Sequence, residues 1–235
     1  MKKVKYEAPS NIALIKYWGK YGTQVPRNSS VSFTLSNCKS IFEVKLQDKT
    51  SHEIDVDLVF EGKKNAKFAS KIASFLGKVE SLYPIVNEYK FQIKSSNTFP
   101  HSSGIASSAS SMAALAMCLE DLQFKGDINL QRASNTARLA SGSASRSIIP
   151  KLGWWGTHDY MPLSSNEYAI PVWEDVDDVF YDYQNTILIA SSGEKSVSST
   201  AGHELMNKHI YAKQRFQNAN QNIIDLYGAM REGDL

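Results

Sequence analysis

The sequence predicts an α+β protein, because strand-like alternation and helix-like spacing occur in separate parts of one chain. Apolar residues recur at every second position around Val44 and Leu46 and again from Ile54 to Phe60, which is the period of a half-buried strand. The apolar residues between Phe68 and Leu76 follow helical spacing instead. Mixed strands and helices, with hairpins early in the chain, are typical of the α+β class.

Each further element follows from a local pattern. A turn at residues 48–51 is expected to join the first two strands, and Gly77 suits the end of the first helix. Alternation predicts a strand at 89–93. The remaining expected elements are helices at 107–122 and 130–139, a strand at 187–190 and a long helix within 205–230.

Composition excludes several classes of protein. The chain has 235 residues, of which 42% are hydrophobic, enough for a sizeable core. The formal net charge is only +2, so no nucleic acid is expected as a partner and any anion site must be local. The basic N-terminus lacks the apolar stretch of a signal peptide, and serines interrupt the most apolar run, 105–119. With only Cys38 and Cys118 available, a cytoplasmic protein without membrane partners is predicted.

A serine- and glycine-rich loop at residues 100–111, Pro-His-Ser-Ser-Gly-Ile-Ala-Ser-Ser-Ala-Ser-Ser, lies between a predicted strand and a predicted helix. Small residues let backbone N–H groups approach an anion, and a helix N-terminus adds free donors and partial positive charge. The loop therefore suits a phosphate group. The same composition also suits a flexible loop that leads into a tightly packed helix. The chain has no G-x-x-x-x-G-K-[ST] motif, so this is not a Walker A loop.

Two further segments carry cations and hydroxyl groups. If 12–18 is extended, Lys16, Trp18 and Lys20 share one face and Tyr17 takes the other. Two ammonium groups on one face suit an anionic ligand, although a surface strand with solvated lysines has the same pattern. The segment 141–147, Ser-Gly-Ser-Ala-Ser-Arg-Ser, offers hydroxyls beside the planar fork of Arg146. The same sequence would also fit the end of a helix at which Arg146 caps the last backbone carbonyls.

Together these segments resemble the mevalonate diphosphate decarboxylase family of the GHMP kinase superfamily. The loop is similar to the superfamily's Pro-x-x-x-Gly-Leu-Ala-Ser-Ser-Ala sequence, with Ile105 in place of leucine. The Lys-Tyr-Trp-Gly-Lys and Ser-Gly-Ser-x-x-Arg segments match the decarboxylase branch. The resemblance implies a GHMP kinase-like fold. Its N-terminal domain, 1–180, is expected to be ribosomal protein S5 domain 2-like, and 181–235 would begin a ferredoxin-like C-terminal domain. The acidic stretch 174–182 is the expected seam.

The resemblance also implies roles for individual residues. It implies that Lys16 and Arg146 act in catalysis. It also implies that ATP binds to the serine loop and that the substrate diphosphate binds to the other two segments. Mg²⁺ is expected to bridge the ATP phosphates, and no residue is assigned as a metal ligand. The implied ATP-binding residues are Ser102, Ser103, Gly104, Ile105, Ala106, Ser107, Ser108 and Lys195. The implied substrate-binding residues are Tyr17, Trp18, Lys20, Ser141, Ser143, Arg146 and Thr200.

The implied activity is ATP-dependent decarboxylation of (R)-5-diphosphomevalonate to isopentenyl diphosphate, a step of the mevalonate pathway. The family's catalytic aspartate belongs to a Thr-x-Asp-Ala-Gly motif that this sequence lacks. We therefore expect a C-terminally truncated chain that does not turn over substrate alone. Two alternatives are a GHMP-type kinase that phosphorylates mevalonate or a mevalonate phosphate without decarboxylation, and a non-catalytic ligand-binding protein. Homodimers are common in the family.

Overall fold

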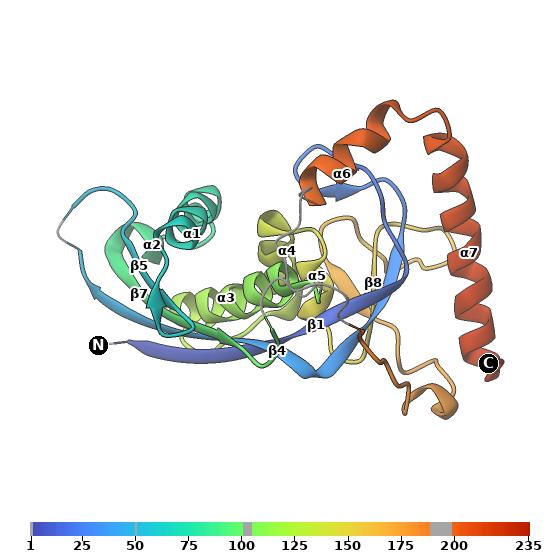
Figure 1. Ribbon diagram of the computed structural model, residues 1–235, viewed down its shortest axis with the longest axis horizontal. Coiled ribbons are helices and arrows are strands. Elements are labelled where there is room, and N and C mark those ends of the chain that lie inside the picture. Colours follow the sequence, from blue (N-terminus) through green and yellow to red (C-terminus); the bar gives the residue numbers. More distant parts are fainter. Residues whose placement is uncertain (1, 50, 101–104, 189–198) are drawn as a thin grey trace.

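The computed structural model describes residues 2–49, 51–100, 105–188 and 199–235, with the side chains of 199 and 200 excepted. One long strand, β4 (Ser30–Asp48), organises the sheet. Strand β1 (Lys3–Ile15) pairs antiparallel with β4 along most of its length. On its other edge, β4 pairs with β8 (Leu152–Trp155) near its start and with β7 (Tyr89–Asn97) near its end. Figure 1 shows β1 and β4 running together beneath the helices.

The register of β1 against β4 is interrupted between Pro9 and Asn11. A bulge of this kind inserts extra residues into one strand and changes the direction of nearby side chains. Ser10 and Asn11 are consecutive, yet both are buried. The extra residues belong to β4, which runs from Lys39 to Thr34 while β1 runs only from Pro9 to Asn11.

The remaining strands complete the sheet in the order β6-β5-β7-β4-β8-β9. The hairpin expected from the turn at 48–51 is wrong, because β5 (Val56–Phe60) pairs with β7 and not with β4. The β5–β7 pair is parallel, which requires a crossover rather than a tight turn. Helix α1 supplies it. The other strands are short: β6 (Lys63–Lys64), β9 (Ala169–Pro171), and β2 (Lys20–Tyr21) paired with β3 (Val25–Pro26).

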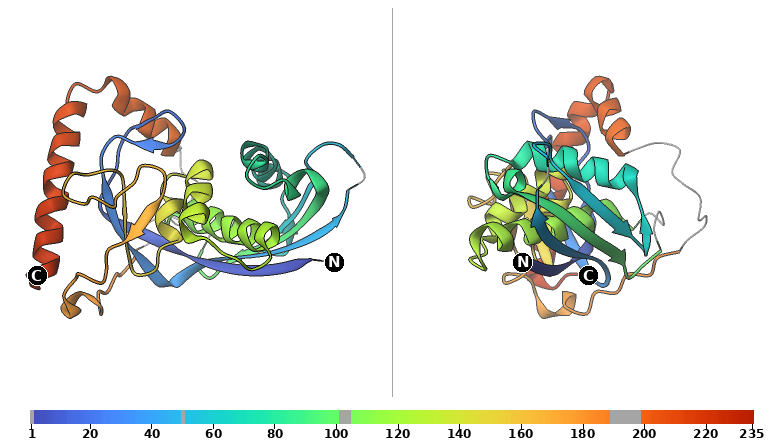
Figure 2. Two further views of the ribbon diagram at one scale, coloured as in Figure 1. Left: turned by 180° about the vertical axis from the view of Figure 1, so that it is seen from behind. Right: turned by 90° about the vertical axis from the view of Figure 1, so that its left-hand side faces the viewer.

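Helices cover one face and one end of the sheet, as the two views of Figure 2 show. Their bounds are α1 (Ala66–Val79), α2 (Ile85–Glu88), α3 (Ser107–Phe124), α4 (Leu130–Ala140), α5 (Ala144–Ser147), α6 (Ser199–Leu205) and α7 (Ala212–Glu232), with 3₁₀ turns η1 (Asp178–Phe180) and η2 (Met206–Lys208). Helix α1 continues past Gly77, so the expected end there is wrong. The long helix expected to fill much of 205–230 is confirmed by α7, which begins at Ala212, after η2. No described helix combines the length and apolar character needed to cross a membrane.

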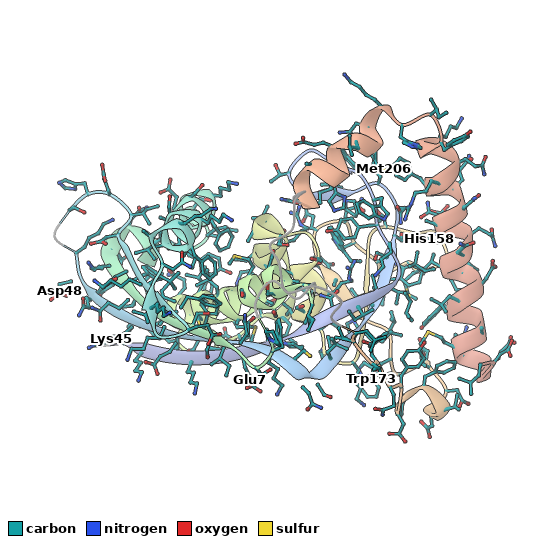
Figure 3. All side chains as sticks on the ribbon, viewed as in Figure 1. Glu7, Lys45, Asp48, His158, Trp173 and Met206 are labelled. Atoms are coloured by element: carbon teal, nitrogen blue, oxygen red, sulfur yellow. The ribbon has the colours of Figure 1, made fainter. Side chains whose placement is uncertain are left out.

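The main core lies between the sheet and α1, α3 and α4. Helix α3 presents alanine and serine to β1 and β4, so its backbone approaches the strands closely. A second apolar cluster packs α7 against β8, with Ile223 and Tyr227 against Trp154. His158 joins the same two elements through Nε2 and the Asn220 carbonyl, 3.2 Å apart (Figure 3).

One buried carboxylate in the core is fully paired. Glu120 is inaccessible to solvent and accepts hydrogen bonds from the Tyr83 hydroxyl at 2.8 Å and the Asn129 N–H at 3.0 Å. Arg132 forms a salt bridge to the same carboxylate at 2.5 Å. The strand expected at 187–190 is not formed at 187 and 188, and its last two residues lie outside the described part of the chain.

Candidate functional site

Arg146, on the short helix α5, is a buried cation without a counter-ion among the described residues. Its side chain donates to the Ser30 hydroxyl at 2.7 Å and to Asn11 Oδ1 at 3.4 Å. Its Nε has no partner although it is inaccessible to solvent. Burial lowers the pKa of the guanidinium to about 10. None of the ion pairs among the described residues involves Arg146. A desolvated cation of this kind is costly unless an anion completes it.

The ring of Tyr17 is the point at which the predicted segments meet. The Arg146 guanidinium carbon lies 5.3 Å from the centre of this ring, and the Lys20 ammonium lies 5.7 Å from it. Trp155 packs edge-on against Tyr17 at 4.8 Å. Lys20 and Arg146 thus converge, as the motifs predict. The expectation that Tyr17 faces away from Lys20 is wrong, because β1 ends at Ile15 and Gly19, with φ of +79°, turns the chain.

The two lysines of the segment reinforce the positive charge of this pocket. Burial, and secondly the charge of Arg146, lower the pKa of Lys16. Burial alone lowers the pKa of Lys20, whose ammonium donates to Gln24 Oε1 at 2.6 Å. The backbone carbonyl of Lys16 accepts from Arg215 of α7 at 2.6 Å, which fixes the loop. The pocket therefore gathers cations before any ligand is present.

The serines of the 141–146 segment connect this pocket to its surroundings. Tyr17 hydrogen-bonds with Ser143. The carbonyl of Ser143 accepts from Asn11 Nδ2 at 3.0 Å. A Cβ atom on Gly142 would lie 2.8 Å from the Trp155 ring and 2.9 Å from the Tyr17 hydroxyl, so only glycine fits there. Trp18 is 41% exposed and faces α6, where it meets Gly202.

A cleft of about 730 Å³ opens between α1 and the start of α3. Ser107, Ser108 and Ser111 line one side, and Lys67 and Lys71 of α1 line the other. Helix α3 begins at Ala106, which has a left-handed backbone and provides no side-chain cap. Its first N–H groups are thus available to an anion. The cleft also has apolar wall residues, including Phe60, Phe68, Met112 and Leu139.

A hydrogen bond links the cleft to the cationic residues around Tyr17. The hydroxyl of Ser108 donates to that of Ser141 at 3.3 Å, which joins the start of α3 to the end of α4. Behind Ser108, the hydroxyls of Ser110 and Ser111 contact Ser40 of β4 at 2.7 and 3.2 Å. Ile105, whose side chain is buried, accepts a hydrogen bond from Ser10 through its carbonyl. The predicted ATP site and the predicted substrate site are therefore neighbours.

Some predicted residues cannot be placed. Ser102, Ser103, Gly104 and Lys195 lie outside the described residues. Thr200 is in the first turn of α6, but its side chain is also outside the described part.

Sequence reasoning missed three side chains that build this site. Asn11 and Ser30 are buried polar residues within strands, where apolar residues are usual, and that departure was an available signal. His203 of α6 stacks on Tyr17, with ring centres 4.9 Å apart and planes 19° apart. Its Nδ1 accepts the Gly19 N–H at 3.1 Å. A single histidine in a helix gives no signal of such a distant contact. Figure 3 shows Met206, just after α6, beside the loop that carries Gly19.

His203 should make the fold less stable in acid. Burial and the charge of Lys20 lower the pKa of its imidazole to about 4, below the ordinary value of 6.5. Between these values the unfolded chain binds a proton that the folded chain does not, so stability falls as the pH drops from about 6.5 towards 4. In urea denaturation at pH 7 and pH 5, the wild-type chain should lose more stability than His203→Phe. Equal losses in the two chains would contradict this.

Comparisons with known proteins agree with this geometry. Residues 8–165 match the family model of the diphosphomevalonate decarboxylase-like N-terminal domain. The diphosphomevalonate decarboxylase of Schizosaccharomyces pombe is 30% identical over 97% of this chain and 60% of its own length. The chain spans between about half and two thirds of the length of the curated relatives it matches.

Two solved structures carry the same fold. Mevalonate diphosphate decarboxylase from Staphylococcus aureus has a TM-score of 0.80 and 28% identity, over 99% of this chain and 68% of that one. The structure named MDDEF, in complex with MVAPP, AMPPCP and magnesium, has a TM-score of 0.76 and 27% identity, over 99% of this chain and 69% of that one. The second relative binds an ATP analogue and Mg²⁺ together.

Proposed function

Because this chain belongs to the diphosphomevalonate decarboxylase-like family, we propose that it serves the ATP-dependent decarboxylation of mevalonate 5-diphosphate to isopentenyl diphosphate. ADP, phosphate and CO₂ are the other products. The single observation that carries the proposal is the buried guanidinium of Arg146, which has a free Nε and no described counter-ion. A substrate diphosphate would supply the missing negative charge and accept bidentate hydrogen bonds.

The cationic pocket is assigned to the substrate. Lys20 and Arg146, which both lie near the Tyr17 ring, bind the diphosphate, and the hydroxyls of Ser141 and Ser143 add neutral donors. Lys16 is assigned to the reacting end of the substrate, where its ammonium offsets developing negative charge. The convergence of Lys20 and Arg146 on Tyr17 supports this assignment.

The cleft beside α3 is assigned to ATP. Its volume of about 730 Å³ suits a nucleotide. The free N–H groups and hydroxyls at Ser107 and Ser108 would bind the phosphates, and the apolar wall would contact the base. The described residues contain no cluster of three His, Cys, Asp or Glu side chains for a metal. Mg²⁺ commonly keeps several waters and binds phosphate oxygens with few protein ligands. The serine hydroxyls and the phosphates of ATP would therefore suffice to hold it. When bound, Mg²⁺ would offset the negative charge of the phosphates.

The chemistry explains why the two sites must adjoin. A tertiary hydroxide leaves poorly, so the γ-phosphoryl group of ATP is first transferred to the 3-hydroxyl of the substrate. Phosphate then departs, and the C–CO₂ bond supplies the electron pair of the new double bond. Arg146 and the two lysines hold both anionic ends, so their work is positioning and charge stabilisation. The Ser108–Ser141 contact supports transfer between adjacent sites.

The proposal includes a domain boundary near residue 180. The family match ends at 165, and η1 at Asp178–Phe180 precedes the segment that leads to α6 and α7. A homodimer is proposed on family resemblance alone.

Ligand binding and product analysis test the function. Calorimetry should show that mevalonate 5-diphosphate binds at least about tenfold more tightly than the monophosphate, because one charged pair is worth about 1.5–3 kcal/mol. Release of CO₂ with ADP would support decarboxylation. ADP without CO₂ would favour a kinase, whereas tight binding without either product is the result expected of a chain that lacks the family's aspartate motif. Equal affinity for the two phosphates would contradict the substrate assignment.

Ser108→Ala should impair ATP binding more than substrate binding. The hydroxyl lies at the start of α3 and inside the nucleotide cleft, so its removal deletes a phosphate donor worth about 1 kcal/mol or more. We expect the Kd for ATP to rise at least fivefold while the Kd for mevalonate 5-diphosphate changes less than twofold. Ser74→Ala, on the opposite wall of the cleft, is a matched control. An unchanged ATP affinity would remove Ser108 from the phosphate site.

A further inference from the structure

His203 is fixed in place by contacts to a segment far away in sequence. The Gly19 N–H, 184 residues away, donates to Nδ1 at 3.1 Å. The imidazole stacks on Tyr17 and meets Trp18 at 5.2 Å between ring centres. Three contacts thus determine the plane and the orientation of a side chain on the short helix α6.

The contact at Nδ1 also determines where the proton lies. Because Nδ1 accepts a hydrogen bond, the neutral imidazole carries its proton on Nε2. Burial and Lys20 keep the ring neutral at pH 7. No described residue accepts a hydrogen bond from Nε2. His203 therefore holds an oriented donor that lacks an acceptor in the described part of the chain.

His203 lines a pocket of about 240 Å³ together with Lys20 and Gln24. Lys20 lies over the same Tyr17 ring on which His203 stacks. The exposed carboxylate of Glu204 also borders the pocket. A neutral donor beside an ammonium group suits an oxygen of a phosphate group.

We propose that His203 is a substrate-binding residue whose Nε2–H donates to the diphosphate held by Lys20 and Arg146. This rests on the proposed function of the site. Helix α6 then does more than cover the pocket, because it delivers a hydrogen-bond donor from the second part of the chain to an anion site built by the first.

Three variants separate the functions of the ring. Glutamine places its amide N–H near the position of Nε2, asparagine places its oxygen near Nδ1, and phenylalanine retains only the stacking. By calorimetry with mevalonate 5-diphosphate, His203→Gln should bind within about threefold of wild type. His203→Asn and His203→Phe should bind at least about tenfold more weakly, the usual scale for a lost hydrogen bond to a charged group.

The ranking of these variants decides the matter. Wild-type affinity in the asparagine or phenylalanine variant, or equal losses in all three, would overturn the donor assignment and leave His203 a packing residue. In either case tight binding by wild type would leave the proposed function standing. If wild type fails to bind mevalonate 5-diphosphate, the proposed function fails, and the same ranking measured with inorganic diphosphate tests the donor.

Discussion

Arg146→Ala is expected to weaken the binding of mevalonate 5-diphosphate by about 100-fold or more. The guanidinium is buried and no described residue neutralises it, and the loss of one partner from a desolvated charge pair costs roughly 2–5 kcal/mol. The measurement is calorimetric titration of purified wild-type and variant chains at pH 7. ATP affinity should change little, because Arg146 does not line the cleft beside α3. A loss in substrate affinity below threefold would count against the assigned role.

Stability provides a second readout for the same variant. In the free chain Arg146 has no described ion pair, so its removal relieves the cost of a buried charge and the thermal midpoint should not fall appreciably. Arg132→Ala is the matched control, because Arg132 pairs with the buried Glu120. That control should unfold at lower temperature and bind substrate as wild type does. The reverse pattern would identify Arg146 as a structural residue.

Gly142→Ala is expected to disturb both the fold and the substrate pocket. The new methyl group would lie 2.8 Å from the ring of Trp155 and 2.9 Å from the Tyr17 hydroxyl. Trp155 is completely buried and cannot swing outwards. Overpacking of this kind costs about 1–3 kcal/mol. Denaturation should show that loss, and the displacement of Tyr17 should weaken substrate binding at least tenfold by calorimetry.

A second glycine controls for the substitution itself. A Cβ on Gly228, within α7, would meet nothing within 4 Å. Gly228→Ala should therefore stabilise the chain by about 0.5–1 kcal/mol through helix propensity and leave substrate affinity unchanged. If Gly142→Ala behaved like this control, the close approach of helix α5 to Tyr17 would not be a constraint on the pocket.

The sequence predicted the convergence of Lys20 and Arg146 because each motif carries its own chemistry. Charged and hydroxyl side chains near small residues indicate anion binding wherever they occur, and their agreement in one family resemblance predicted one pocket. His203 escaped prediction, since its importance comes from stacking on Tyr17 across the fold. The local sequence around residue 203 contains no pattern that predicts this contact.

Strand pairing was predicted less well than strand existence. Alternation located β4, β5 and β7, but it does not reveal which strands are neighbours or whether they run parallel. The turn residues after Asp48 favoured a hairpin, whereas β5 finds its partner in β7. Likewise the alternating pattern continued through Trp18, although the positive φ of Gly19 turns the chain after β1 ends.

The break in the β1–β4 register beside Ser10 and Asn11 has a consequence for how the two ligand sites are joined. On a regular strand, neighbouring side chains point to opposite faces. Here Ser10 reaches the Ile105 carbonyl before α3, while Asn11 reaches Ser143 and Ser147 of the α5 region. The dipeptide Ser10-Asn11 therefore anchors both the segment before α3, assigned to ATP, and the α5 region, assigned to the substrate. The spacing between the two proposed ligand sites therefore depends on these two adjacent residues.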